Sequence, residues 1–323
     1  MCKPVRALLA VLLAALAVAA GGAGHAAEKV KAAVGQRGAW DTMVTLFAAE
    51  RGFFRDEGLE VEILWTRGGA ETLQAVITGS VEFGIANGLA GVLGALEKRA
   101  PVRIVSAQMT GAGDLFWYVR TESPIRGMKD MNGRTMAYSR PGSSSHLVAQ
   151  ALARQAGVTP RFVSAGAVPD TRTQVMSGQL DAGWGNPPFI LDLEGEGKVR
   201  MIANGNDVPA LREQTVRVNV ANAAFLKSRR EAARGFMKAY ARALAWMYEA
   251  PDAAVKRFAE ENKVGLEVAR RSVGFFPRSA LTLAPIAGLE ASMAEAVEFK
   301  NIARPFTKEE LGQLIDLVYD ATK

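Results

Sequence analysis

Three consecutive serines, Ser143, Ser144 and Ser145, stand between a Pro-Gly break and an apolar run that begins at Leu147. Residues 134–138 alternate as a strand does, and the run from Leu147 has the pattern of an amphipathic helix. The serines would therefore stand at a helix N-terminus, where backbone N–H groups lack intrahelical partners and the helix dipole is positive. This combination predicts a receptor for a small anion. The alternative is that one serine caps the helix and the others are solvated.

His146 follows these serines, and it is the only histidine after residue 26. Its imidazole could hydrogen-bond a ligand or lie solvated on the helix. Serine hydrolysis needs a nucleophile, a base and an orienting acid in contact, and a metal site needs several ligands. One histidine three residues from Ser143, no Gly-x-Ser-x-Gly segment and a single cysteine, Cys2, do not supply them. We therefore expect no enzyme activity, no catalytic residue, no metal and no cofactor.

A second group of candidate residues follows the first expected strand, as Gly38-Ala39-Trp40-Asp41-Thr42. The Trp40 ring could form the wall of a pocket, and Asp41 could accept a hydrogen bond from a donor on a ligand. Alternatively, Trp40 packs in the core and Asp41 only caps the helix after it. We include Trp40, Asp41 and Thr42 among the expected substrate-binding residues.

Further loops at strand ends carry polar or aromatic side chains. In Thr66-Arg67-Gly68-Gly69 the glycines permit close approach of a backbone, and Arg67 could pair with an anion or lie on the surface. An Asn-Gly pair at 87–88 and the segment 184–188 place side chains at the ends of two later strands. From these loops, the serine turn and the aromatic strand near 115–119, the expected contacts are Arg67, Asn87, Gly88, Tyr118, Ser143, Ser144, Ser145, His146, Trp184 and Asn186.

Strand and helix patterns alternate along most of the chain, which predicts an α/β fold. The expected strands are 31–35, 59–64, 81–86, 102–107, 115–119, 134–138, 161–164, 180–184, 198–203 and 216–220. The expected helices are 41–52, 71–78, 89–98, 145–156, 170–178 and 188–194. The C-terminal third is mostly helical, with segments at 229–249, 252–261, 266–272, 293–299 and 308–320.

The N-terminus has the pattern of an export signal. Lys3 and Arg6 precede an apolar run at 7–20 that is too short to span a bilayer comfortably, and small residues follow it. We expect cleavage after Ala26, which would remove Cys2 and leave a chain without thiols. No later apolar run is long enough to cross a membrane. The sequence thus predicts an exported, periplasmic protein.

The charge balance gives no sign of a nucleic-acid partner. Without Lys3 and Arg6 the formal charge falls from +6 to +4, a mild excess that is spread over the chain. A nucleic-acid interface would show a basic stripe with interleaved aromatic residues, and the sequence has none. We therefore expect no nucleic acid among the partners.

The exported chain, about 297 residues, exceeds the size at which one core usually keeps growing, so we expect two lobes. Residues 27–113 plus 215–323 would form lobe one, and 114–214 an inserted lobe two. Two crossing segments, near 111–119 and 211–219, would form the hinge. Ligands of open α/β sheets bind beyond the carboxyl ends of strands, and pockets favour domain interfaces. The expected site is therefore the cleft between the lobes.

Five short motifs stand in a specific order along the chain: FRDEGLEV at 54–61, TGSVEFG at 78–84, MKDMNGR at 128–134, PGS at 141–143 and SGQLDA at 177–182. In this order the chain resembles bacterial ABC-transporter periplasmic substrate-binding proteins of the sulfonate/nitrate/taurine and thiamine-pyrimidine-precursor type. The resemblance implies the two-lobed periplasmic-binding-protein fold (type II), with lobe one discontinuous. It also implies a solute delivered to an ABC permease and its ATPase, and we expect a monomer.

The candidate residues point to two kinds of ligand. The serine turn suits a sulfonate, carboxylate or nitrate, and the aromatic side chains suit a flat or apolar body. Asp41 would repel a bare anion unless it caps its own helix, and it suits an amine or ring N–H. We expect a small organic anion captured for import. The alternatives are a nitrogen heterocycle such as a thiamine-type pyrimidine precursor, or a solute sensor for a membrane receptor.

Overall fold

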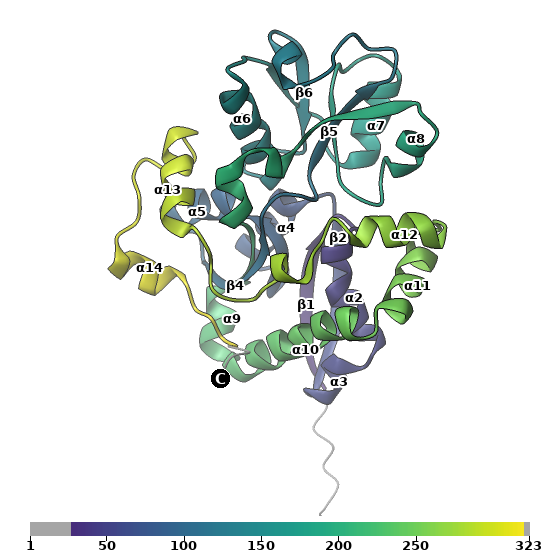
Figure 1. Cartoon of the computed structure of the whole chain (residues 1–323). Helices are drawn as coiled ribbons and strands as arrows, with labels where there is room; N and C mark the ends of the chain where they lie inside the picture. The colour runs from purple at the N-terminus through teal and green to yellow at the C-terminus, as the bar shows by residue number, and fades with distance from the viewer. Residues whose placement is uncertain (1–26, 320–323) are drawn as a thin grey trace, which may run out of the picture.

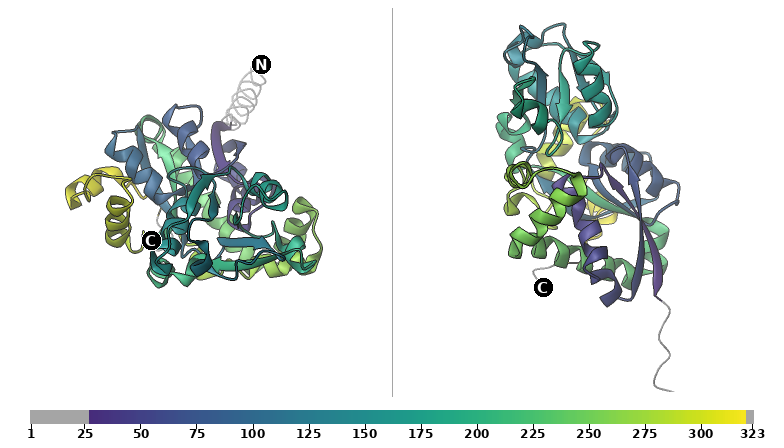
Figure 2. Two further views of the ribbon diagram at one scale, coloured as in Figure 1. Left: turned by 90° about the horizontal axis from the view of Figure 1, so that it is seen from above. Right: turned by 90° about the vertical axis from the view of Figure 1, so that its right-hand side faces the viewer.

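Residues 27–319 are described by a computed structural model, and they form two α/β lobes that lie one above the other (Figure 1). The side view in Figure 2 shows the same division, with the teal lobe above the purple and green one. The predicted export signal, 1–26, lies outside the described residues. Within residues 27–319, no helix combines the length and the apolarity needed to span a membrane.

The lower lobe in Figure 1 is built on one mixed sheet with the strand order β2-β1-β3-β10-β4. β1 runs parallel to β2 and β3, whereas β10 is antiparallel to β3 and β4. The strands are β1 Glu28–Gly35, β2 Leu59–Thr66, β3 Phe83–Gly88, β4 Val102–Thr110 and β10 Thr215–Asn222. Strand β10 comes from more than 100 residues further along the chain, so this lobe is discontinuous in sequence.

Helices cover both faces of this sheet, as a largely parallel sheet requires. Along β1, Val30, Ala32 and Val34 belong to one apolar core, and Ala33 belongs to the other. The first core includes residues of α2 (Met43–Glu50), α3 (Phe53–Asp56) and α10 (Arg230–Glu249). The second includes residues of α4 (Gly69–Ile77), α5 (Leu89–Glu97) and α13 (Leu289–Glu298). Because successive side chains of a strand point to opposite faces, the two cores lie on opposite faces of the sheet.

The upper lobe is built on two small sheets, one of three strands and one of two. β5 (Phe116–Arg120) lies between β8 (Gly183–Gly185) and β9 (Val199–Asn204) and is antiparallel to both. β6 (Thr135–Tyr138) pairs in parallel with β7 (Arg161–Ser164), and a bridge from Met136 to Ala182 links the two ribbons. The helices of this lobe are α6 Ser144–Ala156, α7 Val168–Met176 and α8 Leu191–Gly195.

Two segments connect the lobes, and they lie side by side. Gly111 N donates to Gln214 O at 2.9 Å, where β4 ends and β10 begins. A few residues further on, Ala112 N donates to the Asn206 side chain at 2.9 Å and Gly205 N donates to Leu115 O at 2.8 Å. The exact lobe boundaries, 113/114 and 214/215, stay a prediction.

The remaining helices wrap the lower lobe: α9 Ala223–Ser228, α11 Pro251–Asn262, α12 Leu266–Val273 and α14 Lys308–Leu314. Short 3-10 turns lie at η1 Trp40–Thr42, η2 Met128–Met131, η3 Gly205–Asp207, η4 Pro209–Glu213 and η5 Arg278–Ala280. The helix predicted over 308–320 ends at Leu314, because Ile315 pairs with Ile104 at the sheet edge and Asp316 N donates to Ile104 O. The strand predicted over 81–86 runs instead over Phe83–Gly88, so that Asn87 and Gly88 are its last two residues.

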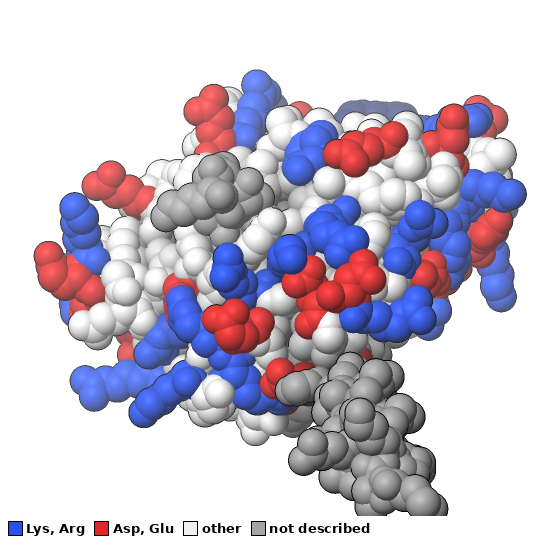
Figure 3. All heavy atoms as spheres, turned by 90° about the horizontal axis from the view of Figure 1, so that it is seen from below, with Lys and Arg blue, Asp and Glu red and all other residues white. Residues whose placement is uncertain are grey.

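On the face seen in Figure 3, basic and acidic side chains are interspersed rather than gathered by sign. Ion pairs connect neighbouring elements of the lower lobe in this way. Arg242 of α10 pairs with Asp56 of α3 at 2.9 Å, and Lys238 of α10 pairs with Glu57 at 2.9 Å. These exposed pairs contribute little to stability individually.

Candidate functional site

A small cavity lies between the two lobes, at the carboxyl ends of β1 and β3. Its volume is about 50 Å³. Because one water needs about 10–15 Å³, the cavity holds a group of a few heavy atoms. The lining residues from the lower lobe and the connection are Gly35, Gln36, Ala39, Asp41, Thr42, Gly68, Gly69, Ala86, Gly88, Leu115 and Arg217. Those from the upper lobe are Ser139, Ser143, Ser144, Ser145, Trp184 and Asn186.

Three helices begin at the cavity wall. α4 starts at Gly69, α5 starts directly after Gly88, and α6 starts at Ser144. The N–H groups of the first turn of each helix have no partner within that helix, and each dipole is positive at this end. Backbone groups of both lobes therefore contribute positive partial charge to the wall of the cavity.

The three predicted serines all line the cavity, and their hydroxyls differ in what they bond. Ser143 Oγ caps α6 by accepting from His146 N at 3.2 Å. Ser145 Oγ accepts from Ser139 N at 3.0 Å and lies 3.0 Å from Ser143 Oγ. The half-buried Ser144 has no side-chain partner among the described residues. The Ser144 hydroxyl is therefore the one that is free to bond a ligand.

Buried charges form the floor of the cavity. Asp41 (2% exposed) and Arg217 (6% exposed) both line it. Arg217 Nη2 donates to Asp114 Oδ2 at 2.8 Å, and its Nε lies 3.5 Å from Asp41 Oδ2. Gln108 Nε2 donates to the same Asp41 oxygen at 2.9 Å. One guanidinium thus serves two carboxylates.

Burial shifts the protonation equilibria of this cluster. Burial raises the pKa of Asp114 from 3.8 to about 6, although Arg217 opposes the rise, and the nearby Asp41 adds to it. Burial alone would lower the pKa of Arg217, but Asp114 and Asp41 more than offset this and hold it above its ordinary value. Arg217 therefore keeps its charge, and the raised pKa makes the Asp114 carboxyl a weaker acid than a solvated aspartate.

Trp184 and Asn186 were both predicted as ligand contacts, and they line the cavity from the upper lobe. Trp184 Nε1 donates to Gly166 O at 3.2 Å, so one ring edge is fixed within its own lobe. The Asn186 side-chain oxygen accepts from Gln36 Nε2 at 3.3 Å, which joins the two lobes across the cavity.

Five of the predicted residues do not line the cavity, and three of these five are buried elsewhere. Trp40 is fully buried, with its ring 5.3 Å from Phe258 edge to face and its Nε1 bonded to Tyr248 Oη at 3.1 Å. Tyr118 is fully buried in the upper lobe, where strand β5 turns it into the core. Asn87 belongs to β3, where its side chain is buried and Nδ2 donates to Gly84 O at 2.8 Å.

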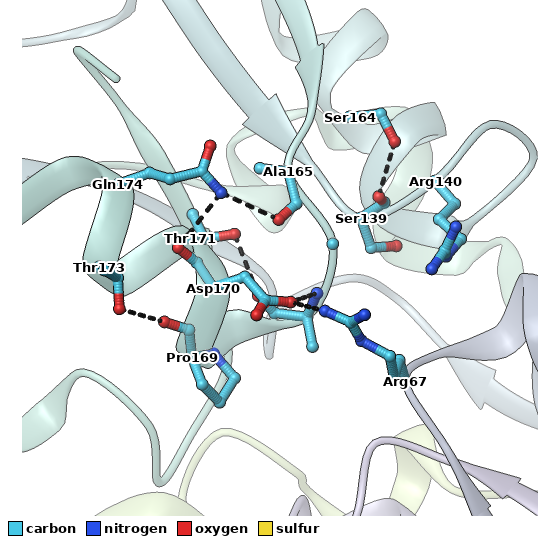
Figure 4. Close-up of polar contacts among 12 residues, drawn as sticks. Arg67, Ser139, Arg140, Ser164, Ala165, Pro169, Asp170, Thr171, Thr173 and Gln174 are labelled. Carbon is cyan, nitrogen blue, oxygen red and sulfur yellow. Dashed lines mark hydrogen bonds and ion pairs between the residues drawn. The ribbon is translucent and has the colours of Figure 1, made fainter. Parts of the chain in front are cut away.

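Arg67 lies at the rim of the cleft and pairs with Asp170 of the other lobe (Figure 4). Asp170 also accepts from Ala167 N at 3.0 Å, which holds it at the start of α7. Since this pair uses the guanidinium, Arg67 joins the lobes and does not line the cavity. His146 does not line it either, because its ring stacks on Tyr138 with centroids 4.2 Å apart.

Other ion pairs also connect the lobes around the cleft. Arg140 Nη2 lies 2.7 Å from Glu71 Oε1, and Arg271 Nη1 lies 2.6 Å from Glu194 Oε2. On the side of α13, Arg154 Nη2 lies 3.1 Å from Glu295 Oε1. The lobes are therefore in contact at several points of the rim.

Arg217 and Gln36 are cavity residues that sequence reasoning missed. Arg217 stands in the segment Thr-Val-Arg-Val-Asn-Val, where a charged residue interrupts a strand of buried residues. A buried charge needs a partner, so this interruption was a signal. Gln36 carries no such signal, because its position is set by a positive φ of 59° after β1.

A family model described as NMT1/THI5 like matches residues 40–254, about two thirds of the chain. Among curated proteins, no sequence matches this chain. Within the part of the chain that the structure describes, no group of three or more His, Cys, Asp or Glu residues is placed to hold a metal ion.

Solved structures show the same fold. The periplasmic aliphatic sulphonate binding protein SsuA from Escherichia coli is 20% identical, with a TM-score of 0.69 over 89% of this chain and 92% of that one. The alkanesulfonate-binding protein SsuA from Xanthomonas axonopodis pv. citri, bound to MOPS, is 19% identical, with a TM-score of 0.72 over 87% and 96%. The desulfurization enzyme DSZB is 17% identical, with a TM-score of 0.62 over 89% and 96%. The chain thus has the two-lobed fold of periplasmic binding proteins.

Proposed function

This chain belongs to the NMT1/THI5-like family, and from that premise we propose that it is the periplasmic solute-binding component of an ABC import system. The cavity between the lobes is its ligand site. The ligand is a small organic anion whose sulfonate or carboxylate group enters the cavity. The sulphonate-binding and alkanesulfonate-binding titles of two proteins with the same fold support this class of ligand.

The observation that carries the proposal is the convergence of three helix N-termini on one cavity. The same small cavity is lined by Gly69, Gly88 and Ser144, which stand at the starts of α4, α5 and α6. An anion is stabilised there without a lysine, because unpaired N–H groups and helix dipoles act together. The Ser144 hydroxyl adds a donor, and the Arg217 side chain adds a cation to the lining.

The volume of about 50 Å³ suits the charged group and not a larger body. The rest of the ligand would extend along Trp184 and Leu115, which are the two large apolar residues of the lining. A ring or short alkyl chain packs well against an indole. This arrangement favours an anion with an apolar or aromatic body.

The protein can capture a ligand because both lobes contribute residues to the cavity. A ligand that bonds both Gly88 and Ser144 stabilises the state in which the lobes are in contact. A membrane permease with its ATPase would then recognise this closed form and take the solute. The protein acts as a monomer in this scheme, since one chain supplies all lining residues.

We propose that the site is not catalytic, although the similar DSZB is an enzyme. Acyl or sulfur transfer through a serine requires a base in contact with the hydroxyl. Ser143 Oγ and Ser145 Oγ are bonded to backbone N–H groups and to each other. The His146 ring stacks on Tyr138 and makes no bond to either serine in the described chain.

A nitrogen heterocycle is the second candidate ligand, and the Asp41 carboxylate is the observation that favours it. Asp41 lines the cavity and has one oxygen, Oδ2, bonded to Gln108. Its other oxygen could accept from an amine or ring N–H, as in a thiamine-type pyrimidine precursor. Such a ligand would donate a hydrogen bond to Asp41, and its uncharged acceptor atoms would bond the N–H groups at the helix N-termini.

A thermal-shift screen of the protein against alkanesulfonates, aromatic sulfonates, carboxylates, nitrate and pyrimidines tests the proposal. We expect the melting temperature to rise with a sulfonate or carboxylate, because a ligand that binds only the folded chain stabilises it. Asp41→Asn separates the two candidates. It should spare or improve binding of an anion and weaken binding of an amine-bearing pyrimidine. A shift from pyrimidines alone would overturn the anion assignment.

A further inference from the structure

We propose that Asp114, which does not touch the cavity, determines how strongly the cavity binds an anion, and that anion binding is coupled to uptake of a proton by Asp114. The inference rests on the proposed function, since it concerns the anion held near Arg217. It adds a residue from the connection between the lobes to the groups that set ligand specificity.

The buried cluster around Arg217 contains more negative than positive charge. Two carboxylates, Asp41 and Asp114, share this one guanidinium, so the ionised cluster carries a formal charge of −1. All three side chains are at least nine-tenths buried. An anion in the cavity would add a second negative charge to the same low-dielectric region, which is costly without another cation.

The other groups that face this cluster are polar but uncharged. From β4, Gln108 bonds Asp41 and lies 3.3 Å from Arg217 Nε. From α10, the Tyr240 hydroxyl interacts with Asn219 and Gln108 and keeps its proton, because burial raises its pKa far above neutral. Tyr248 lies further out, beneath Arg278. Among the described residues, none of these neighbours except Arg217 is a cation, so no second cation offsets the charge of Asp114.

Asp114 has one carboxylate oxygen that can bind a proton. Asp114 Oδ2 accepts from Arg217, whereas Oδ1 is buried and has no hydrogen-bond partner among the described residues. A proton from solvent on Oδ1 neutralises the carboxyl without breaking the bond to Arg217. The cluster then has no net charge, and the guanidinium is available to the anion. Burial already raises the pKa of Asp114 to about 6, which places this step within reach of ordinary conditions.

Asp114 lies in one of the two segments that connect the lobes. It lies between Gly113 and Leu115 in the segment that connects β4 to β5, and Leu115 lines the cavity. Arg217 lies just after the second connecting segment. The pair therefore joins the two connections, while Arg217 alone of the two contacts the cavity.

Isothermal titration calorimetry with methanesulfonate at pH 5, 6, 7 and 8 tests the inference, because this anion does not titrate in that range. We expect the affinity of the wild type to rise about tenfold from pH 8 to pH 5, as coupling between neighbouring sites allows. Asp114→Asn should bind about tenfold more tightly than wild type at pH 8 and show no dependence on pH. Near pH 6.5, wild-type binding should take up about half a proton, measured in buffers of different ionisation enthalpy.

Two matched controls keep the result specific. Glu60→Gln removes one exposed acid from β2, at the end of the sheet away from the cavity, and should keep the wild-type pH profile. His146→Gln should keep the slope as well, since burial lowers the pKa of His146 and its ring stacks on Tyr138. Loss of the slope in His146→Gln would overturn the assignment to Asp114.

The calorimetry distinguishes an incorrect role for Asp114 from an incorrect assignment of the anion site. Methanesulfonate binding with one affinity at all four pH values would overturn the role of Asp114 and leave the anion site intact. No binding to either protein at any pH would overturn the anion site and this inference together. If Asp114→Asn does not fold, the wild-type pH profile and the proton count decide the question by themselves.

Discussion

Gly88 and Ser144 touch across the junction of the two lobes, so closely that a Cβ on Gly88 would lie 2.7 Å from Ser144 N. The same Cβ would lie 2.7 Å from Gly142 O. Gly88 has an ordinary φ of −60°, so glycine is needed here for space and not for backbone conformation. The end of β3 therefore fits against the start of α6 only because one residue has no side chain.

Gly88→Ala should weaken anion binding by about tenfold or more, because the added methyl opposes contact between the lobes at a cost of about 1–3 kcal/mol. Titration calorimetry measures the affinity, and X-ray scattering measures whether the ligand still makes the protein more compact. Gly312→Ala is the matched control, since a Cβ there meets nothing within 4 Å. Equal affinity in Gly88→Ala and wild type would show that the lobes do not close on this contact.

Ser144→Ala should reduce anion affinity about tenfold, since a hydrogen bond to a charged group contributes about 1.5–3 kcal/mol. Its melting temperature should stay unchanged, because the hydroxyl has no partner in the described chain. Ser143→Ala is expected to lower stability by about 1 kcal/mol, because it removes the cap of α6. Urea unfolding and calorimetry on both variants separate the two roles. Equal loss of affinity and stability in both would contradict this division.

Trp40→Ala should lower the free energy of unfolding by about 3–5 kcal/mol, because it opens a cavity among Phe47, Tyr248 and Phe258. Any loss of binding should follow from this destabilisation, and should be small at a temperature where the variant stays folded. Denaturant melts and calorimetry at 10 °C provide both numbers. Intact stability with lost binding would return Trp40 to the ligand site.

Arg67→Gln should weaken anion binding by a factor of about two to five, because it removes one pair that joins the lobes at the exposed rim. Salt should reduce the difference from wild type, since screening weakens exposed pairs. Calorimetry in 20 mM and 500 mM NaCl measures this. A larger defect that persists at high salt would mean that Arg67 contacts the ligand directly.

Asp114 should also make stability depend on pH. Its pKa is raised in the folded state, from 3.8 to about 6, so the folded chain binds the proton more tightly than the unfolded chain. Stability from this group is then complete below pH 4 and falls as the pH rises to 6, by about 3 kcal/mol. Urea melts of wild type and Asp114→Asn at pH 4.5 and 7 should show this difference, and Glu60→Gln should follow wild type. Parallel curves for all three proteins would refute the raised pKa.

Much of the local structure could be predicted from the sequence. Ser143 at the start of α6 and Gly157 at its end follow local rules of capping, and the apolar alternation of β2 follows the strand period. These features need only neighbours within a few residues. The same holds for the serine turn as the positive end of a helix, since a helix N-terminus is positive wherever it lies.

Side-chain direction could not be predicted in the same way. Trp40 and Asp41 are adjacent, yet η1 turns Trp40 into the aromatic core and Asp41 into the cavity. Tyr118 and Asn87 stand on strands whose two faces are both buried, so alternation gave no sign of which side faces a ligand.

Sequence by itself determined the alternating α/β elements, the helix start with its serines and the family motifs, because propensity, capping and order along the chain are local properties. Only the tertiary structure decided which charges meet. Asp114 and Arg217 are 103 residues apart, and their pairing depends on two connecting segments that run side by side. Burial then makes that pair matter, because a carboxylate removed from water must find a cation or a proton.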